Sequence, residues 1–119
     1  MSAGPVGASV PPLSLRVEVG EDVTLVYCSG KLTAAQTGLL RDEVKPLLVR
    51  SKKVVLDLAE ISQMDSMGLG TILALYVSAK SAGSQLELVH LSERVRELFR
   101  ITNLLSHFDK YGEHIIRTP

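Results

Sequence analysis

The feature that most limits the fold is a short apolar run, Val54 to Leu58, between two stretches with helical periodicity. The run is rich in β-branched residues and too short for a helix, which is typical of a strand covered on both faces. Because helical stretches flank it, its neighbouring strands are reached through right-handed crossovers that make them parallel. We therefore predict that this strand is central in an α/β fold.

The remaining strand-like segments complete an alternating order. Residues from Leu13 to Val19 and from Val23 to Cys28 are separated by turn residues, Gly20-Glu21-Asp22, and predict an antiparallel hairpin. Residues 85–90 alternate as another strand, and a weaker pattern predicts a strand from His107 to Lys110. The predicted order is ββαβαβαβ, a mixed, mostly parallel sheet packed with helices.

Three helices follow from apolar residues at helical spacing. Thr33 can cap the first, while Pro46 should kink or end it, because proline lacks the backbone donor and crowds the preceding turn. The apolar stripe of this first helix comprises Leu39, Leu40, Val44, Leu47 and Leu48.

The second helix should run roughly from Ser66 to Ala82. Gly83 lies where a left-handed C-terminal cap is favoured. Ser92 can cap the third helix and Asn103 can end it.

Length and composition predict one domain with a real core. The chain has 119 residues, 45% of them apolar. Its first dozen residues contain three prolines and no periodicity. We expect a flexible N-terminal tail over residues 1–12 and a single domain over residues 13–119.

Charge and hydropathy exclude several classes of partner. Thirteen basic and thirteen acidic residues cancel, with no basic stripe, so we expect no nucleic-acid partner. Apolar runs fall short of the roughly 18 residues of a spanning helix, and a signal peptide is missing. We expect a cytoplasmic protein without membrane insertion, whose single Cys28 lies in the core.

The loop "QMDSMGLG", from Gln63 to Gly70, places Ser66 at a strand-to-helix turn. Functional sites in parallel sheets lie beyond the carboxyl ends of the strands. Ser66 could be a helix cap, a catalytic nucleophile or an acceptor for a modifying group. The cap and acceptor roles are compatible, because a phosphate would meet exposed amides at the positive end of a helix.

An enzymatic role is not expected. "MDSMG" resembles the nucleophile elbow G-x-S-x-G, and His90, His107 and His114 lie downstream, but Met64 replaces the glycine that permits the strained turn. "SGKLT" resembles the end of a P-loop, but Leu25 occupies the position of the earlier glycine. The histidines and cysteine lack ligand spacing, so we expect neither metal nor cofactor.

The neighbours of Ser66 leave alternatives open. Gly68 and Gly70 are costly in a first helical turn unless a backbone packs closely or a partner approaches. Met64 and Met67 suit either the core or an adaptable binding surface.

Two segments, "MDSMGLG" and "LSERVRELFRITNL", resemble the STAS domain, specifically the bacterial anti-sigma-factor antagonists, over roughly Leu13 to Tyr111. The resemblance implies that an anti-sigma kinase, which binds ATP, phosphorylates Ser66. It also implies that the unphosphorylated form binds this kinase and frees its sigma factor. The implied phosphorylation loop contains Asp65, Met67, Gly68 and Gly70.

The chain departs from the family pattern at several positions. Gly30-Lys31-Leu32-Thr33 corresponds to the family's Gly-Glu-Leu-Asp turn, so Lys31 reverses a charge and Thr33 keeps only the capping role. Met67 replaces the usual second hydroxyl, and the residues after Tyr111 are too few for the family's full final helix. We expect Gly30, Lys31, Thr33 and Met64 to contact the partner.

Two functional hypotheses result. The first is an anti-sigma-factor antagonist that is released from its partner on phosphorylation of Ser66. The alternative is a constitutive STAS interaction subunit of a transport complex or signalling scaffold, without phosphorylation. In either role we expect a monomer or weak dimer.

Overall fold

The computed structural model describes residues 11–103 and 116–117. Its element order confirms the predicted ββαβαβαβ arrangement, with a short 3-10 helix added before the first α-helix. The elements are β1 (Leu13–Val19), β2 (Val23–Leu32), η2 (Ala34–Gln36), α1 (Thr37–Arg50), β3 (Lys53–Met64), α2 (Ser66–Ser81), β4 (Gln85–Val89), α3 (Glu93–Ile101) and β5 (Ile116–Arg117).

The sheet has the strand order β1-β2-β3-β4-β5, so β3 is central as predicted. The β1–β2 hairpin is antiparallel, and the Gly20 N–H donates to the Val23 carbonyl across its turn at 2.9 Å. The other strand pairs are parallel. The strand predicted over residues 107–110 lies outside the described residues.

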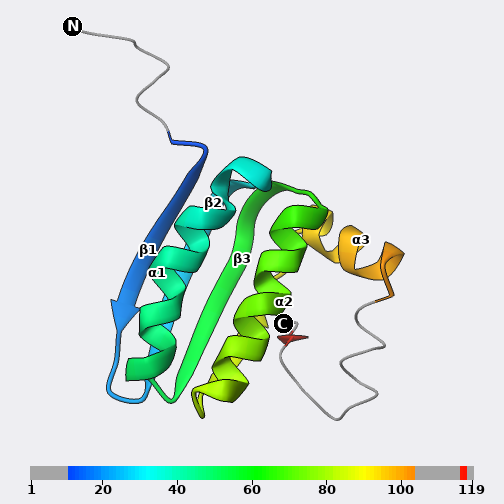
Figure 1. Cartoon of the computed structure of the whole chain (residues 1–119). Helices are drawn as coiled ribbons and strands as arrows, with labels where there is room; N and C mark the ends of the chain where they lie inside the picture. The colour runs from blue at the N-terminus through cyan, green and yellow to red at the C-terminus, as the bar shows by residue number, and fades with distance from the viewer. Residues whose placement is uncertain (1–10, 104–115, 118–119) are drawn as a thin grey trace, which may run out of the picture.

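Helices α1 and α2 lie side by side across one face of the sheet (Figure 1). Both helices begin at the same end of the molecule, where β2 and β3 finish. Helix α3 lies near that end and contacts β3 (Figure 1). This arrangement brings the starts of two parallel helices to one edge of the fold.

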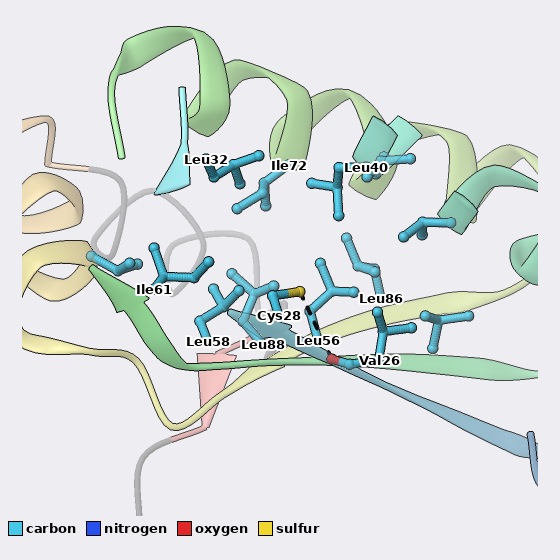
Figure 2. Close-up of a cluster of buried hydrophobic side chains, with 14 of the residues drawn as sticks. Val26, Cys28, Leu32, Leu40, Leu56, Leu58, Ile61, Ile72, Leu86 and Leu88 are labelled. Atoms are coloured by element: carbon cyan, nitrogen blue, oxygen red, sulfur yellow. Dashed lines mark hydrogen bonds between the residues drawn. The ribbon is translucent and has the colours of Figure 1, made fainter. Parts of the chain in front are cut away.

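The core fills the space between these helices and the sheet (Figure 2). On β3, alternating side chains point into it, and Val54, Leu56 and Leu58 are fully buried. Cys28 is buried among them, as predicted, with 2% of its surface exposed. The other core residues labelled in Figure 2 are Val26, Leu32, Leu40, Ile61, Ile72, Leu86 and Leu88.

Two expectations for the first helix are wrong, namely that it ends at Pro46 and that Leu39 lies on its buried stripe; a kink at Pro46 stays a prediction. Helix α1 continues through Pro46 to Arg50, because Pro46 and the residue four positions earlier, Asp42, are both exposed and the Asp42 carbonyl can bond water. Leu39 lies off the buried stripe and is 44% exposed. Thr33 precedes η2, and α1 begins one turn later.

Strands β2 and β3 extend beyond their predicted ends. The Gly30 to Leu32 segment continues β2 instead of forming a turn, and β3 reaches Met64. The register between these strands shifts between Tyr27 and Ser29 and again between Gly30 and Lys31. These irregularities interrupt the alternation of apolar residues that marks a strand in the sequence.

The predicted helix ends are largely confirmed. Helix α2 ends at Ser81, and Gly83 follows with φ 75°. The Val95 N–H donates to the Ser92 hydroxyl at 3.4 Å, and Asn103 takes φ 60° after α3. Within the described ranges, no helix is long and apolar enough to cross a membrane.

Candidate functional site

The candidate site lies where β3 passes into α2, beside the connection from β2 to α1 (Figure 1). Parallel pairing of β2 with β3 sets Lys31 opposite Gln63 and Leu32 opposite Met64. A single residue, Asp65, separates β3 from α2. The predicted loop and the predicted partner residues are therefore neighbours, although they are far apart in sequence.

Asp65 joins the start of α2 to the start of η2, which directly precedes α1. Its Oδ1 accepts from the Gly68 N–H at 2.9 Å, and its Oδ2 accepts from the Ala34 N–H at 3.1 Å. The Gly68 N–H is the main cause that lowers the pKa of Asp65 below its ordinary value; desolvation opposes this, and the Ala34 N–H adds to it. An ionised carboxylate therefore caps α2 and orients the β2–α1 connection.

Ser66 is not the cap that the sequence suggested. Asp65 has the extended backbone of an N-cap residue, and Ser66 is the first helical residue. The carboxylate, with two acceptor oxygens, satisfies the orphan amide that Ser66 was expected to satisfy. The Ser66 side chain is exposed, and its hydroxyl makes no hydrogen bond with another described residue.

The two glycines of the loop have different roles. A Cβ on Gly68 would lie 2.2 Å from the Leu32 carbonyl oxygen, so α2 can approach the end of β2 only with glycine there. A Cβ on Gly70 would meet nothing within 4 Å. Close packing therefore explains Gly68, whereas Gly70 keeps the surface beside Ser66 open.

The two methionines divide between core and surface. Met64 is half-buried and packs against the hydrophobic core. Met67 is 59% exposed, directly after Ser66. Met67 is therefore available to another molecule, while Met64 mainly anchors the end of β3.

The β2 end of the site combines backbone structure with one exposed charge. Gly30 has φ 107°, and a Cβ there would lie 2.1 Å from the Pro12 carbonyl oxygen. The Lys31 N–H donates to that oxygen at 2.7 Å, while the Lys31 residue is exposed. Thr33 donates to the Gln36 Oε1 through its N–H at 3.1 Å and its hydroxyl at 2.7 Å. Of these predicted contact residues, Lys31 has the side chain most open to a partner.

Two cations near Ser66 were not singled out from the sequence. Arg41 and Lys45 are exposed on α1 and line a groove of about 240 Å³ with Ser66. Their spacing of four residues on one helix was a usable signal, but only the parallel placement of α1 and α2 brings them to the serine. The other lining residues are Met67, Gly70, Thr71, Ala74, Leu75 and Ser78.

The described residues do not assemble a nucleophilic dyad at Ser66. His90 Nδ1 lies 3.0 Å from Asp57 Oδ2, and no described base contacts the serine hydroxyl. His107 and His114 lie outside the described residues. Across residues 11–103 and 116–117, no group of three or more potential metal ligands comes together.

Comparison with known sequences gives a consistent family. The model of the STAS domain matches residues 14–118, which extends the predicted resemblance beyond Tyr111. The anti-sigma-B factor antagonist of Bacillus subtilis (strain 168) is 31% identical over 97 residues, covering 82% of this chain and 89% of that relative.

Solved structures share the fold. The anti-sigma factor antagonist SpoIIAA in its unphosphorylated form aligns with a TM-score of 0.71 and 16% identity, over 89% of this chain and 88% of that chain. The murine anion transporter Slc26a9, in its inward-facing state, aligns with a TM-score of 0.62 and 20% identity, over 83% of this chain but only 16% of that chain. These likenesses confirm the predicted α/β fold.

Proposed function

The chain belongs to the STAS domain family and, within it, to the anti-sigma-factor antagonists, and from this premise we propose that it is a partner-switching regulator. It binds an anti-sigma factor while Ser66 is unmodified and is released when Ser66 carries a phosphate. The observation that supports this most directly is the exposed Ser66 hydroxyl, which is free because Asp65 caps α2 in its place.

The position of Ser66 allows a phosphate to be added without disturbing the fold. The hydroxyl is exposed at the first helical residue, where the helix dipole favours negative charge. In the proposed reaction the partner kinase transfers the γ-phosphoryl group of ATP to Ser66 Oγ, releasing ADP and a proton. The regulator itself needs no cofactor, metal or catalytic residue.

The proposed contact surface surrounds this serine. Met67 supplies an exposed apolar side chain, Gly70 leaves space above α2, and Lys31 presents a charge from β2. A phosphate adds about 1.5 to 2 negative charges in the middle of this surface. These charges weaken the binding of an acidic or apolar partner. Gly30, Thr33 and Met64, which are half-buried, are the other proposed contact residues.

We propose the same setting as the sequence predicts. The STAS domain comprises residues 13–119, preceded by a tail of residues 1–12, and works in the cytoplasm as a monomer or weak dimer. Its partner is an anti-sigma factor with serine-kinase activity, and the protein contacts neither nucleic acid nor the membrane interior.

The test uses the full chain, ATP and each anti-sigma kinase of the host. Intact-mass measurement should show one added phosphate on the wild type and none on Ser66→Ala. Ser81→Ala, an exposed serine at the other end of α2, is the matched control and should be modified normally. The switch is wrong if no kinase modifies the wild type, or if Ser66→Ala is still phosphorylated.

A second candidate is a constitutive STAS interaction subunit. Met67 in place of the usual second hydroxyl supports it, as does the fold shared with part of an anion transporter. In a pull-down from the host, this candidate predicts equal recovery of one partner by wild type and Ser66→Asp. The partner switch predicts that Ser66→Asp recovers markedly less.

A further inference from the structure

The groove between α1 and α2 is lined by two cations as well as by the proposed phosphoacceptor. Arg41 and Lys45 lie one helical turn apart on α1, and Ser66 lines the same groove from α2. No Asp or Glu is among its lining residues. The groove therefore has the charge of an anion site, and a hydroxyl at its edge.

Both cations are available to bind an anion in the groove. Neither Arg41 nor Lys45 makes a hydrogen bond or ion pair with another residue of the described chain. Long helical side chains extend toward the N-terminus of their own helix. Arg41 does so, because its Nη2 lies 3.8 Å from the position that a Cβ would take on Gly38. Since α1 and α2 begin at the same end, this direction leads toward the start of α2 (Figure 1).

The groove also has room for a phosphoryl group. Its volume is about 240 Å³, and a Cβ on Gly70 would meet no atom within 4 Å. Phosphate oxygens accept paired hydrogen bonds from a guanidinium, and an ammonium can neutralise the remaining charge. The space, the donors and the proposed acceptor hydroxyl therefore lie together.

We propose that Arg41 and Lys45 form an intramolecular receiver that holds the phosphoryl group of phospho-Ser66 in the α1–α2 groove. This inference rests on the proposed phosphorylation of Ser66. The held phosphate occupies the gap above Gly70 and engages the two cations. Phosphorylation therefore changes both the shape and the charge of the surface beside Met67, in addition to repelling acidic groups of a partner.

The test separates the receiver from the kinase. Phosphoserine is placed at position 66 of the full chain by genetic encoding, and its second ionisation, ordinarily near about pH 6, is followed by phosphorus NMR. The charged groups around the phosphate are Arg41 and Lys45 on α1, Asp65 before α2 and Lys31 near the end of β2. We expect the titration midpoint to lie about one pH unit lower in the wild type than in Arg41→Gln/Lys45→Gln, because cations favour the dianion.

The controls isolate these two side chains. Arg50→Gln removes an exposed cation of the same helix outside the groove and should leave the midpoint unchanged. The helix N-terminus and Asp65 are common to all variants, so the difference reports the cations alone. Arg41→Lys should restore part of the shift. Circular dichroism checks the fold, which exposed substitutions should preserve.

Equal midpoints in the wild type and the double variant would overturn the receiver, as would an equal shift caused by Arg50→Gln. If the titration midpoint is lower in the wild type than in the double variant, but no kinase modifies Ser66, the receiver stands and the proposed switch fails. If a kinase modifies Ser66 but the midpoint is insensitive to Arg41 and Lys45, the receiver alone fails.

Discussion

The two halves of β3 are held in place by different kinds of interaction. From Lys53 to Asp57 the strand keeps a regular register with both β2 and β4, and it buries Val54 and Leu56 completely. From Ala59 to Met64, in the described part of the sheet, it pairs with β2 alone, across two register irregularities. Ile61 is the one buried residue of this second half.

This difference separates the scaffold from the site. Burial of apolar side chains stabilises the first half, so its sequence is tightly limited. Backbone hydrogen bonds and close backbone contacts position the second half, which leaves its side chains open. The Ser66 loop follows directly from that second half, so backbone contacts position the site without covering it.

The largest loss of stability should come from truncating a buried side chain in the first half of β3. Leu56→Ala removes a fully buried side chain and should lower the free energy of unfolding by about 2–5 kcal/mol. Glu60→Ala, at an exposed position of the second half, should change it by less than about 0.5 kcal/mol. Urea unfolding followed by circular dichroism measures both. Similar losses would show that the two halves do not differ as described.

The next effect contrasts the two glycines after β3. Gly68→Ala places a Cβ against the Leu32 carbonyl and should destabilise by about 1–3 kcal/mol. Gly70→Ala meets open space and should stabilise α2 by up to about 1 kcal/mol, because alanine has the higher helix propensity. Thermal unfolding of the two variants should give shifts of opposite sign. A shift of the same sign in both would refute the assignment of separate roles.

A smaller loss of stability should follow from replacing the carboxylate that caps α2. Asp65→Asn keeps one acceptor oxygen but cannot accept from both Gly68 and Ala34, so its melting temperature should fall by a few degrees at neutral pH. The folded pKa of Asp65 is lowered from 3.8, so the carboxylate's contribution is complete above that value and is lost as the pH falls through the lower folded pKa. The difference between wild type and variant should therefore be constant near neutrality and shrink below about pH 4.

Asp65→Ala, which removes both acceptor oxygens, should lower the melting temperature further and show the same pH window. A difference from wild type that persists unchanged into strong acid would mean that the ionised carboxylate is not what holds the two helix starts.

The smallest perturbation uses Cys28, which lies in β2 where the register first shifts. Burial, with a smaller contribution from the Asp57 carboxylate, raises the pKa of the Cys28 thiol to about 12. Because the thiolate is the nucleophile, iodoacetamide near about pH 8 should leave the native thiol unmodified while it alkylates the urea-unfolded chain. Mass spectrometry follows the reaction. Equal rates would show that this part of β2 opens readily.

Apolar patterning and end signals were sufficient to predict the scaffold. The Val54 to Leu58 run indicated the central strand, and Gly83 and Ser92 indicated helix boundaries, because each feature acts locally. The helix end predicted from Pro46 was wrong, because the effect of a proline depends on which side of α1 faces solvent. The extent of β2 was also missed, because its pairing with β3 accommodates irregularities that interrupt the period of two.

The site was predicted less completely, for a related reason. The importance of Ser66 could be inferred from its position after a strand, but Asp65 takes the cap through the Gly68 N–H. Its second hydrogen bond, from the Ala34 N–H, comes from a segment that is distant in sequence. Arg41 and Lys45 reach the site only through the packing of α1 beside α2. Contacts between distant segments therefore determined what the loop sequence left open.

The site contains two kinds of residue with different freedom to vary. Gly68 and Asp65 belong to one kind, and Lys31 and Met67 belong to the other. Gly68 and Asp65 are fixed by backbone contacts, whereas Lys31 and Met67 face outward and can be exchanged without disturbing the fold. Substitutions at these two positions should therefore alter the exposed surface beside Ser66 while the architecture stays the same.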